Sequence, residues 1–428
     1  MAKYQQYEEY KKSGIEWVGE IPAHWEETPV FSCFDATTEK NLDGKESNVL
    51  SLSYGNIIKR DVDTNFGLLP ESFNTYQIVG VGDIILRLTD LQNDKKSLRV
   101  GLAKEKGIIT SAYLKLKPKE RLDSGFAYRL LHSYDTTKVY YGLGGGLRQS
   151  MKFEDFRRLP ILVPPYEEQV KIANFLDHET AQIDTLIDKQ QALIQLLKEK
   201  RQAVISHAVT KGLNPNAPMK DSGVEWLGEV PEHWEVRKLK YVCDLITKKT
   251  EIHNQYVIAL ENIESWTGNF VSSDSNYSGQ DVGFDTGDIL FSKLRPYLAK
   301  VYLAQAEGVA FGDLLVYRPK KELLNKYGFY LMTNEGFINT VNSSTYGSKM
   351  PRASTEFISE MPVVIPLLQE QKQIVAYVDK ILARFDSLVL KAETAIQLMQ
   401  ERRTALISAA VTGKIDVRGW QAPDNKAS

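Results

Sequence analysis

The chain contains the same fourteen-residue motif twice. The segment from Ser13 to Glu26 returns as Ser222 to Glu235, 209 positions later, with both tryptophans in place. A second echo pairs the stretch 159–210 with 361–412 at an offset of 202 residues. Solenoid repeats have periods of about 20 to 50 residues, so this repeat is a duplicated half-protein. Two similar halves in one chain predict a pseudo-twofold molecule, which would bind a ligand through two separate sites.

The two copies differ most between their shared ends. Their offset falls from 209 at the tryptophan motif to 206 at Asn56 and Asn262, 205 at Gly82 and Gly287, and 202 from Pro160 onward. Insertions and deletions therefore fall in the middle part of each half. This pattern is expected when a common scaffold carries two different recognition surfaces.

Length and composition limit the classes of protein to which the chain can belong. At 428 residues it predicts two or more domains. Its two cysteines, Cys33 and Cys243, exclude a disulfide scaffold and are typical of a reducing cytoplasm. We expect no membrane partner, because no apolar run reaches the ~20 residues of a membrane span and the start lacks the apolar core of a signal peptide. The net charge of −2 means that any DNA binding depends on local basic patches.

Between the shared ends, both halves predict mixed α/β structure. Short apolar or alternating runs bounded by Gly and Pro favour strands, whereas helical spacing of apolar residues favours helices. The strand candidates are 79–88, 108–116, 288–291 and 314–317, and the helix candidates are 126–132 and 327–333. The fold class is therefore predicted to be α/β (α+β), with two pseudo-twofold-related domains.

A long uninterrupted helix is predicted at the end of each half. Neither 166–210 nor 367–412 contains Gly or Pro, and Gly212 and Gly413 follow as stop signals. At 1.5 Å per residue, each helix would be roughly 67 Å long. Apolar residues keep a heptad spacing along both segments, which predicts a left-handed coiled-coil pair. The pseudo-twofold symmetry makes that pair antiparallel, with the two domains separated by it.

The order of segments follows from these elements. We expect the first globular domain at 1–164, the first long helix at 165–212, and a linker, the second tryptophan motif and the second domain at 213–365. The second long helix is expected at 366–413, followed by a tail at 414–428. Because the second helix has no tryptophan motif after it, we predict that the first motif packs against its C-terminal end.

Four apolar residues lie off the predicted helix seam. Leu196 and Leu398 occupy one equivalent outward position, and Ile205 and Ile407 occupy another. They either pack on the domain of their own half or form a docking surface for a partner chain. We assign them to a partner-subunit interface.

The duplicated motifs resemble a known family. Leu159 to Ile172 and Met361 to Ile374 each contain a proline, three apolar residues, a second proline and then a Glu–Gln pair. The motif Gly-x-x-Trp-x-Gly-x-x-Pro-x-x-Trp also occurs twice, at 14–25 and 223–234, and so does a Gly-Asp-Ile turn. Over nearly its whole length, the chain resembles the specificity subunits of type I restriction–modification systems.

The resemblance implies a division of labour. In that family each half carries a target recognition domain that reads one half of a bipartite, asymmetric site in double-stranded DNA. The helices act as a ruler for the unspecified spacer. The subunit itself is not an enzyme and holds no cofactor. It recruits two adenine methyltransferase subunits, and the full complex adds two ATP-dependent restriction subunits that translocate and cut DNA.

Basic residues are concentrated in the variable parts. Between Asp83 and Arg121 there are ten Lys or Arg against five acids, in a chain whose net charge is −2. This stretch is either a solvated face or a surface that neutralises phosphates, and we assign the second role. The candidates for phosphate contacts in both halves are Arg87, Lys95, Lys96, Arg99, Lys115, Lys117, Lys152, Lys293 and Arg295.

A glycine-containing loop before each Glu–Gln pair is the candidate for base reading. Glycines permit close approach of the backbone to DNA, Arg reads guanine through paired hydrogen bonds, and Gln reads adenine. The alternative for these loops is an ordinary flexible hairpin. The candidates are Gly145, Arg148 and Gln149 in the first half and Tyr346, Ser348, Lys349 and Arg352 in the second, with Tyr54, Asn56 and Asn262 as weaker ones.

Catalytic signatures are weak. Val163 stands before Pro-Pro-Tyr, where amino-methyltransferases use Asn or Asp to bind the adenine amino group, so that activity is disfavoured. Asp83 and Asp94 with the following lysines loosely fit a metal-dependent nuclease, but a Gly-Asp turn is the simpler interpretation of Asp83. His24 and His233 stand beside tryptophans, which favours structural roles. We therefore predict no catalytic residue, no metal site and no cofactor.

One rival hypothesis comes from a different class. The chain could be an antiparallel coiled-coil adaptor whose globular ends bind proteins and read no DNA. The basic patches and the loops with Arg and Gln favour DNA. A steep dependence of duplex binding on salt concentration would discriminate, because an adaptor lacks it.

Overall fold

The computed structural model divides the chain into two compact units. Unit 1 comprises residues 1–190 and 394–428, and unit 2 comprises residues 191–393. Each unit thus contains one globular domain and one half of each long helix. The residues that the structure describes are 4–61, 72–89, 91, 98–142, 151–252 and 256–422.

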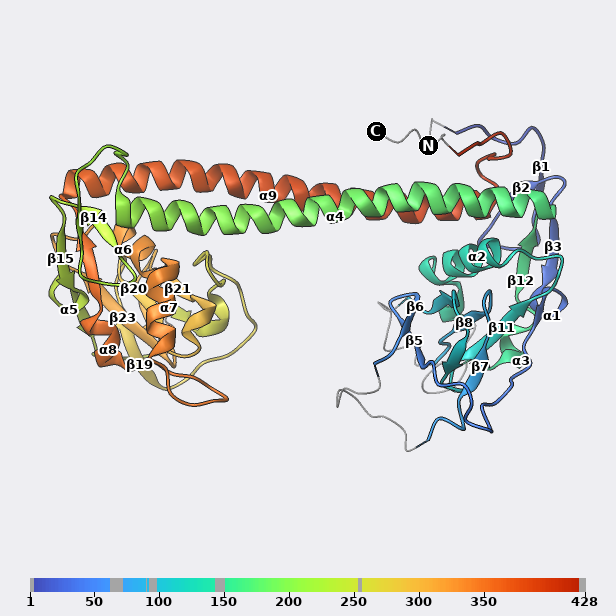
Figure 1. The fold of residues 1–428 in the computed structure, drawn as a ribbon, viewed down its shortest axis with the longest axis horizontal. Coiled ribbons are helices and arrows are strands. Elements are labelled where there is room, and N and C mark those ends of the chain that lie inside the picture. The colour runs from blue at the N-terminus through green and yellow to red at the C-terminus, as the bar shows by residue number, and fades with distance from the viewer. Residues whose placement is uncertain are drawn as a thin grey trace. The chain divides into compact units, whose positions relative to one another are not determined.

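Both predicted long helices are confirmed. They are α4 (Tyr166–Lys211) and α9 (Leu368–Val411), drawn in green and in orange to red in Figure 1. Gly212 and Gly413 follow them with φ of +74° and +70°. A left-handed residue at this position ends a helix, and glycine adopts it without steric cost.

Within each unit the two helices run antiparallel, as predicted. In unit 1, Arg403 Nε of α9 lies 2.9 Å from Asp184 Oδ1 of α4, and Lys171 Nζ, one turn into α4, donates to the carbonyl of Arg418 just beyond α9. In unit 2, Arg201 Nη1 lies 2.5 Å from Asp386 Oδ1. Because Asp386 and Arg403 lie 202 positions after Asp184 and Arg201, the two ion pairs are equivalent and the duplication extends to the helix contacts.

The domain of unit 1 is built on a four-stranded antiparallel sheet. Its strand order is β4 (Phe34–Asp35), β11 (Leu114–Pro118), β8 (Ile84–Leu86) and β9 (Val100–Leu102). Helix α2 packs on this sheet through Phe126 and Leu130, which share a buried core with Ile84, Leu86 and Leu116. Asp123 caps α2 by accepting a hydrogen bond from the Phe126 amide. The remaining described strands of unit 1 form two-stranded pairs, which are β1 (Tyr10–Lys12) with β2 (Glu20–Pro22), β3 (Glu26–Pro29) with β12 (Pro160–Val163), β5 (Leu50–Ser53) with β6 (Asn56–Lys59), and β7 (Gln77–Val79) with β10 (Gly107–Ile109).

The bounds in unit 1 are β1 (Tyr10–Lys12), β2 (Glu20–Pro22), β3 (Glu26–Pro29), α1 (Val30–Cys33), β4 (Phe34–Asp35), β5 (Leu50–Ser53), β6 (Asn56–Lys59), β7 (Gln77–Val79), β8 (Ile84–Leu86), β9 (Val100–Leu102), β10 (Gly107–Ile109), β11 (Leu114–Pro118), α2 (Ser124–Thr136), η1 (Val139–Gly142), α3 (Phe153–Phe156) and β12 (Pro160–Val163).

The domain of unit 2 repeats this plan. Its sheet has the same order of equivalent strands, β16 (Cys243–Ile246), β23 (Leu314–Pro319), β20 (Ile289–Ser292) and β21 (Val301–Leu303). Helix α6 (Asn325–Met332) packs on this sheet through Tyr327 and Leu331. A second four-stranded sheet, β17-β19-β22-β18, contains the one parallel pair among the ladders between described strands, β18 with β22. The mixed α/β class is thus confirmed, as are the predicted strands 288–291 and 314–317 and the predicted helices 126–132 and 327–333. The predicted strands 79–88 and 108–116 are each divided by a turn into two shorter strands, because Gly80 to Asp83 and Thr110 to Tyr113 reverse the chain there.

The bounds in unit 2 are β13 (Met219–Asp221), β14 (Glu229–Pro231), β15 (Glu235–Lys238), α5 (Leu239–Val242), β16 (Cys243–Ile246), β17 (Lys249–Glu251), β18 (Val257–Ile258), η2 (Leu260–Asn262), β19 (Gln280–Phe284), β20 (Ile289–Ser292), η3 (Pro296–Leu298), β21 (Val301–Leu303), β22 (Gly308–Ala310), β23 (Leu314–Pro319), α6 (Asn325–Met332), α7 (Glu335–Ser343), α8 (Thr355–Glu360) and β24 (Pro362–Ile365).

The glutamine of each Glu–Gln pair joins a helix to its domain. Gln169 is fully buried, donates to the Pro164 carbonyl at 2.8 Å and accepts from the Asp123 amide at 2.8 Å. Gln371 repeats both bonds with the Pro366 carbonyl and the Leu324 amide. The same side chain therefore fixes the first turn of α4 and of α9, which explains why the motif is duplicated.

The prediction that the first tryptophan motif packs against the end of the second helix is confirmed. Trp25 is fully buried, and a Cβ at Gly413 would collide with Pro22. Lys414 Nζ donates to the Glu20 carbonyl at 2.6 Å. In unit 2 the second motif covers the end of α4 in the same way, so both halves are closed by the same contact.

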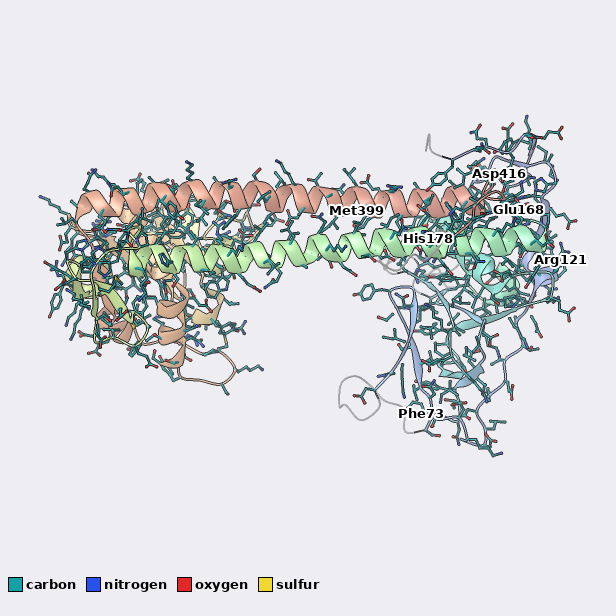
Figure 2. All side chains as sticks on the ribbon, turned by 45° about the horizontal axis from the view of Figure 1, so that its top comes forward. Phe73, Arg121, Glu168, His178, Met399 and Asp416 are labelled. Carbon is teal, nitrogen blue, oxygen red and sulfur yellow. The ribbon has the colours of Figure 1, made fainter. Side chains whose placement is uncertain are left out.

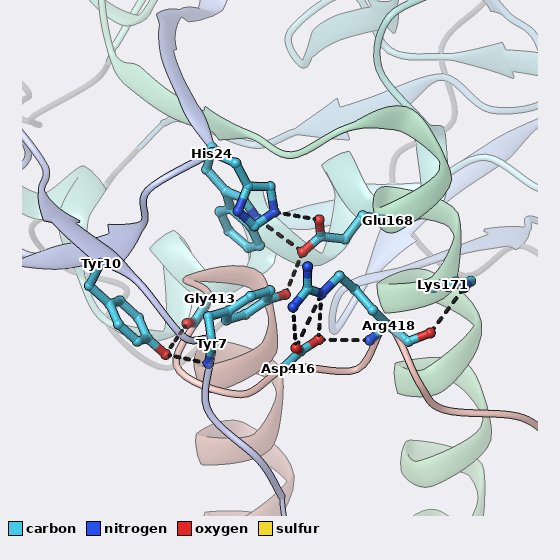
Figure 3. A network of polar contacts seen from close by, with 9 residues as sticks. Tyr7, Tyr10, His24, Glu168, Lys171, Gly413, Asp416 and Arg418 are labelled. Atoms are coloured by element: carbon cyan, nitrogen blue, oxygen red, sulfur yellow. Dashed lines mark hydrogen bonds and ion pairs between the residues drawn. The ribbon is translucent and has the colours of Figure 1, made fainter.

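Unit 1 adds a buried polar network to this closure (Figure 3). Glu168, 5% exposed, accepts from Tyr7 Oη at 2.5 Å and from Trp25 Nε1 at 3.0 Å, and its Oε2 lies 2.8 Å from His24 Nε2. Asp416 belongs to the same end of the unit (Figure 2) and pairs with Arg418 at 2.7 Å. His24 therefore has the structural role expected for it.

Candidate nucleic-acid interface

In unit 2, two loops that carry predicted DNA contacts are joined into one surface. The loop between β20 and β21 follows a fully buried strand, and the loop between α7 and α8 lies beside it. The Ala353 amide donates to the Lys293 carbonyl at 2.9 Å, and the Arg295 amide donates to the Pro351 carbonyl at 2.8 Å. The structure thus brings together Lys293, Arg295, Tyr346, Ser348, Lys349 and Arg352, which the sequence places about 50 residues apart.

A single carboxylate organises the cations of this surface. Asp313, at the turn between β22 and β23, accepts from Arg352 Nη2 at 3.0 Å and from Arg352 Nε at 3.2 Å. Lys293 Nζ lies 3.7 Å from the same carboxylate. The hydrogen bonds to Asp313 raise the pKa of Arg352. The guanidinium is therefore held in one orientation before any ligand arrives.

The rest of the surface is open to solvent. Arg295, Ser348 and Lys349 are exposed, and Tyr346 is 65% exposed. Tyr297 is 46% exposed on the same loop as Arg295 and adds an aromatic side chain that sequence reasoning missed. Cations can bind the phosphates of a nucleic acid, and exposed aromatic rings can stack on its bases.

The loop that presents Arg295 has a strained backbone. Arg295 and Ala299 both have left-handed conformations, with φ of +49° and +45°, on either side of the one-turn helix η3. Such conformations are uncommon outside glycine and persist where the surrounding structure enforces them. Here the hydrogen bond to Pro351 holds the turn.

Unit 1 has the same framework at the equivalent place. The Met151 amide donates to the Leu88 carbonyl at 2.8 Å, as Ala353 does to Lys293 in unit 2. Arg87, beside this junction, is half-buried and has contacts of its own. The base-reading candidates Gly145, Arg148 and Gln149, and the cations Lys95 and Lys96, lie outside the described residues.

Four other candidates of unit 1 are exposed. Tyr54 is 79% exposed at the tip of the β5–β6 hairpin, where its φ is +45°. Asn56 follows it, and Lys117 lies exposed on β11. Lys152 is exposed just before α3. Lys115 is half-buried and its ammonium donates to the Ile78 carbonyl at 3.0 Å, which leaves it poorly placed for a phosphate.

Two predicted DNA contacts are contradicted by their burial. Arg99 is fully buried and donates from Nη1 to the carbonyls of Arg87 and Thr89, so it braces the loop after β8 and cannot reach a phosphate. Asn262 is 3% exposed and is consumed by hydrogen bonds to the Ala259 amide and the Val271 carbonyl. Both side chains form hydrogen bonds with backbone groups in the interior of the domain. The sequence alone does not show that these residues are buried.

The predicted partner interface divides in two. Leu196 and Leu398 are 55% and 59% exposed, so they remain available to a partner. Ile205 and Ile407 are each 2% exposed and belong to the hydrophobic cores of unit 2 and unit 1. For these two residues the prediction is wrong, because they face the domain of their own unit.

The helix pair of unit 2 also carries an apolar groove of about 570 Å³. Tyr377 and Leu388 of α9, 44% and 43% exposed, line it together with Val204 and His207 of α4. This groove is a second exposed apolar surface on the shared helices. It was not predicted, because it needs the register of both helices.

Metal binding finds no support in the described residues. No group of three His, Cys, Asp or Glu among them is placed to hold a metal ion. Asp83 is 4% exposed and accepts from the Gly80 amide at 2.7 Å, so it closes the turn before β8 as expected. Asp288 does the same in unit 2 and also pairs with Arg318. Among the described helices, none is both long and apolar enough to cross a lipid bilayer.

A protein-family model described as the type I restriction modification DNA specificity domain matches the chain twice, over residues 56–196 and 231–397. The chain is 26% identical over 291 residues to the specificity subunit of the type I restriction enzyme EcoDI of Escherichia coli. That match covers 63% of this chain and 65% of the relative. It is 25% identical over 360 residues to the MjaVIII specificity subunit of Methanocaldococcus jannaschii, which covers 80% and 81%.

Solved structures support the same fold. A chain from a study of complex assembly and conformational transition of the type I R-M system has a TM-score of 0.68 at 14% identity and covers 91% of this chain and 98% of its own. The HsdS subunit from Thermoanaerobacter tengcongensis has a TM-score of 0.53 at 13% identity, with coverage of 92% and 98%. At these identities the likeness concerns the fold alone.

Proposed function

The chain belongs to the DNA specificity subunits of type I restriction–modification systems, and from that premise we propose that its two domains each read one half of a bipartite, asymmetric DNA site. The observation that carries this proposal is the difference between two domains on one framework. Unit 2 presents Arg352 held by Asp313, whereas the equivalent of Asp313 along the strands of unit 1 is Ala112. Different side chains at one structural position predict different half-sites.

The proposed contacts divide into two kinds. Exposed cations such as Lys117, Lys152, Arg295 and Lys349 neutralise phosphates and supply affinity without sequence preference. The loops before each Glu–Gln pair and the tip of the β5–β6 hairpin reach the base edges. Direct readout in the major groove needs hydrogen-bonding side chains that reach the base edges.

The long helices set the spacer in this proposal. Two reading heads on one face of B-DNA engage major grooves about one turn apart, roughly 34 Å. Helices of 46 and 44 residues, at 1.5 Å per residue, are ample for that separation. Both helices continue through both units, so a change in their length changes the length of helix between the two domains.

The subunit performs no chemistry and needs no cofactor of its own in this proposal. It recruits two adenine methyltransferase subunits, and two ATP-dependent restriction subunits join the full complex. Leu196 and Leu398, with the groove around Tyr377, provide exposed apolar surface on the helices for such partners.

The test is to sequence methylated adenines in a host that carries this protein and its methyltransferase. We expect one motif made of two different half-sites with a fixed spacer. Binding of the methyltransferase complex to duplex DNA should weaken steeply with salt. A host without any bipartite motif, together with salt-independent binding, would instead support the adaptor hypothesis.

The ruler has its own test. Four residues inserted near Gln190 and near Ala392 lengthen both helices by about 6 Å, close to two base pairs, and add a little more than one turn. The contacts within each unit stay intact, because the insertions fall at the boundary between units. We expect both half-sites unchanged and a spacer longer by two base pairs. Two-residue insertions rotate one head by about 200° and should abolish methylation; an unchanged spacer in the four-residue variant contradicts the ruler.

A further inference from the structure

We propose that Asp313 and Arg352 form a guanine-reading pair for the half-site of the second domain, with Arg352 as the contact and Asp313 as its positioning residue. This inference rests on the proposed function and assigns one base contact within it. It is carried by the way in which the backbone and the side chain of Arg352 are both immobilised.

The backbone of Arg352 is fixed from two sides. Its amide donates to the Tyr346 carbonyl and its carbonyl accepts from the Tyr346 amide, both at 3.1 Å. On the other side, Arg352 forms an antiparallel bridge with Leu294 of the β20–β21 loop. The backbone of this loop residue is therefore held on both sides, like that of a residue in the central strand of a three-stranded sheet.

The side chain is oriented by Asp313. Nε and Nη2 of Arg352 point at the carboxylate, at 3.2 Å and 3.0 Å, so one edge of the planar guanidinium is occupied. Asp313 is itself held in place, because the Lys293 amide donates to its carbonyl and the Gly312 amide before it donates to Asp281. Nη1 of Arg352 has no hydrogen-bond partner among the described residues, and the side chain is 38% exposed.

The remaining edge of the guanidinium matches one base. Nη1 and the second N–H of Nη2 are two parallel donors, and guanine presents two parallel acceptors, O6 and N7, in the major groove. A pyrimidine lacks that pair of acceptors, and adenine replaces one of them with a donor. Holding the side chain in advance also reduces the rotamer freedom that an arginine loses when it binds.

The surroundings favour a nucleic acid over a structural brace alone. Arg295 and Lys349 are exposed beside the pair. Together with Lys293 and Arg352 they outnumber the two carboxylates of Asp313 and Asp281. If the ion pair served only to hold the two loops together, the loops would not need additional exposed cations beside it. Such cations place the guanidinium against a phosphate backbone.

The experiment uses the full chain with its methyltransferase and measures methylation of duplexes randomised over both half-sites. Arg352→Ala should reduce the preference for guanine at one position of one half-site by roughly 5- to 150-fold and leave the other half-site unchanged. Arg352→Lys keeps the charge but loses the planar pair of donors that Asp313 orients, so it should relax the same position in part. Asp313→Asn should relax it partly. Arg237→Ala, which removes an ion pair with Glu322 at 3.4 Å elsewhere in unit 2, is the control and should leave the motif unchanged.

Several results would overturn the assignment. If Arg352→Lys keeps full selectivity, the guanidinium edge that Asp313 orients does not read the base. If Arg352→Ala and Asp313→Asn lower methylation equally for all sequences while the motif stays the same, the pair is only a brace. A bipartite wild-type motif with a half-site that lacks guanine in both strands at the affected end refutes this inference but leaves the proposed function intact. The absence of any bipartite motif refutes the proposed function itself.

Discussion

Replacing Glu168 with alanine should destabilise unit 1 far more than the equivalent change at Glu370 destabilises unit 2. Glu168 is 5% exposed and accepts hydrogen bonds from the Tyr7 hydroxyl and the Trp25 indole, both of them buried. Burial and the neighbouring carboxylate raise the pKa of Tyr7, so its hydroxyl remains a donor at neutral pH. Glu370 contacts His233 at 2.9 Å, and its side chain is 26% exposed.

The magnitude follows from what each substitution leaves behind. In unit 1, Glu168→Ala leaves two buried donors without an acceptor. Each unsatisfied donor lowers the free energy of unfolding by about 1–3 kcal/mol, which gives a total loss of roughly 2–6 kcal/mol. His24 adds little, because its side chain is 39% exposed and water can replace the carboxylate. In unit 2, Glu370→Ala removes one exposed pair that is worth about 0.2–1 kcal/mol.

The assay is urea-induced unfolding, with hydrogen exchange over the first turns of α4 and α9 to assign the loss to a unit. Glu168→Gln is the matched control, because its amide oxygen still accepts one bond and it should lie between wild type and Glu168→Ala. If both alanine variants lose the same stability, the argument from buried donors is wrong. If exchange quickens at α9 in the Glu168 variant and not at α4, the network does not hold the start of α4.

Three further outcomes are expected. Burial and two nearby arginines lower the pKa of His132 to about 4, whereas the unfolded chain protonates this side chain near pH 6.5. The free energy of unfolding should therefore fall by about 3 kcal/mol as the pH drops from 6.5 to 4. In urea titrations, His132→Leu should lack this pH-dependent loss. In thermal unfolding, Gly413→Ala should destabilise the protein by about 1–3 kcal/mol more than Gly212→Ala. Both substitutions place alanine in a left-handed conformation, but only the Cβ at position 413 collides with Pro22. Equal losses of stability would contradict this packing. Lys117→Ala should weaken DNA binding for all sequences and lower the salt slope by about one, measured by titrating labelled duplex with the methyltransferase complex; a changed motif would show that the residue reads a base.

The long helices and the closure of the two halves could be predicted because both depend on local or repeated patterns. Heptad spacing, the absence of Gly and Pro, and a glycine stop are properties of neighbouring residues, and α4 ends within one residue of the expected position. The packing of the first tryptophan motif against the end of α9 followed from symmetry, since the other copy has its helix directly before it in sequence. Duplication supplied the long-range information that a single copy lacks.

The candidate site was harder, because charge and residue type do not reveal burial. Arg99 and Lys117 look alike in the sequence, yet the first is fully buried on two carbonyls and the second is exposed. Ile205 and Leu196 both lie off the helix seam, yet the direction of the domain decides which of them is covered. Local patterns locate a face of a helix but not what packs against it.

The order of the elements, the duplication and the stop of each helix are written in the spacing of residues along the chain, because backbone conformation depends mainly on near neighbours. The pairing of Arg352 with Asp313 is decided only by the tertiary structure. These residues are 39 positions apart, on a loop and a strand turn that neither motif nor period connects. A guanidinium becomes oriented when packing brings a carboxylate to one of its edges, and that meeting depends on how the β20–β21 loop and the α7–α8 loop are held against the turn between β22 and β23.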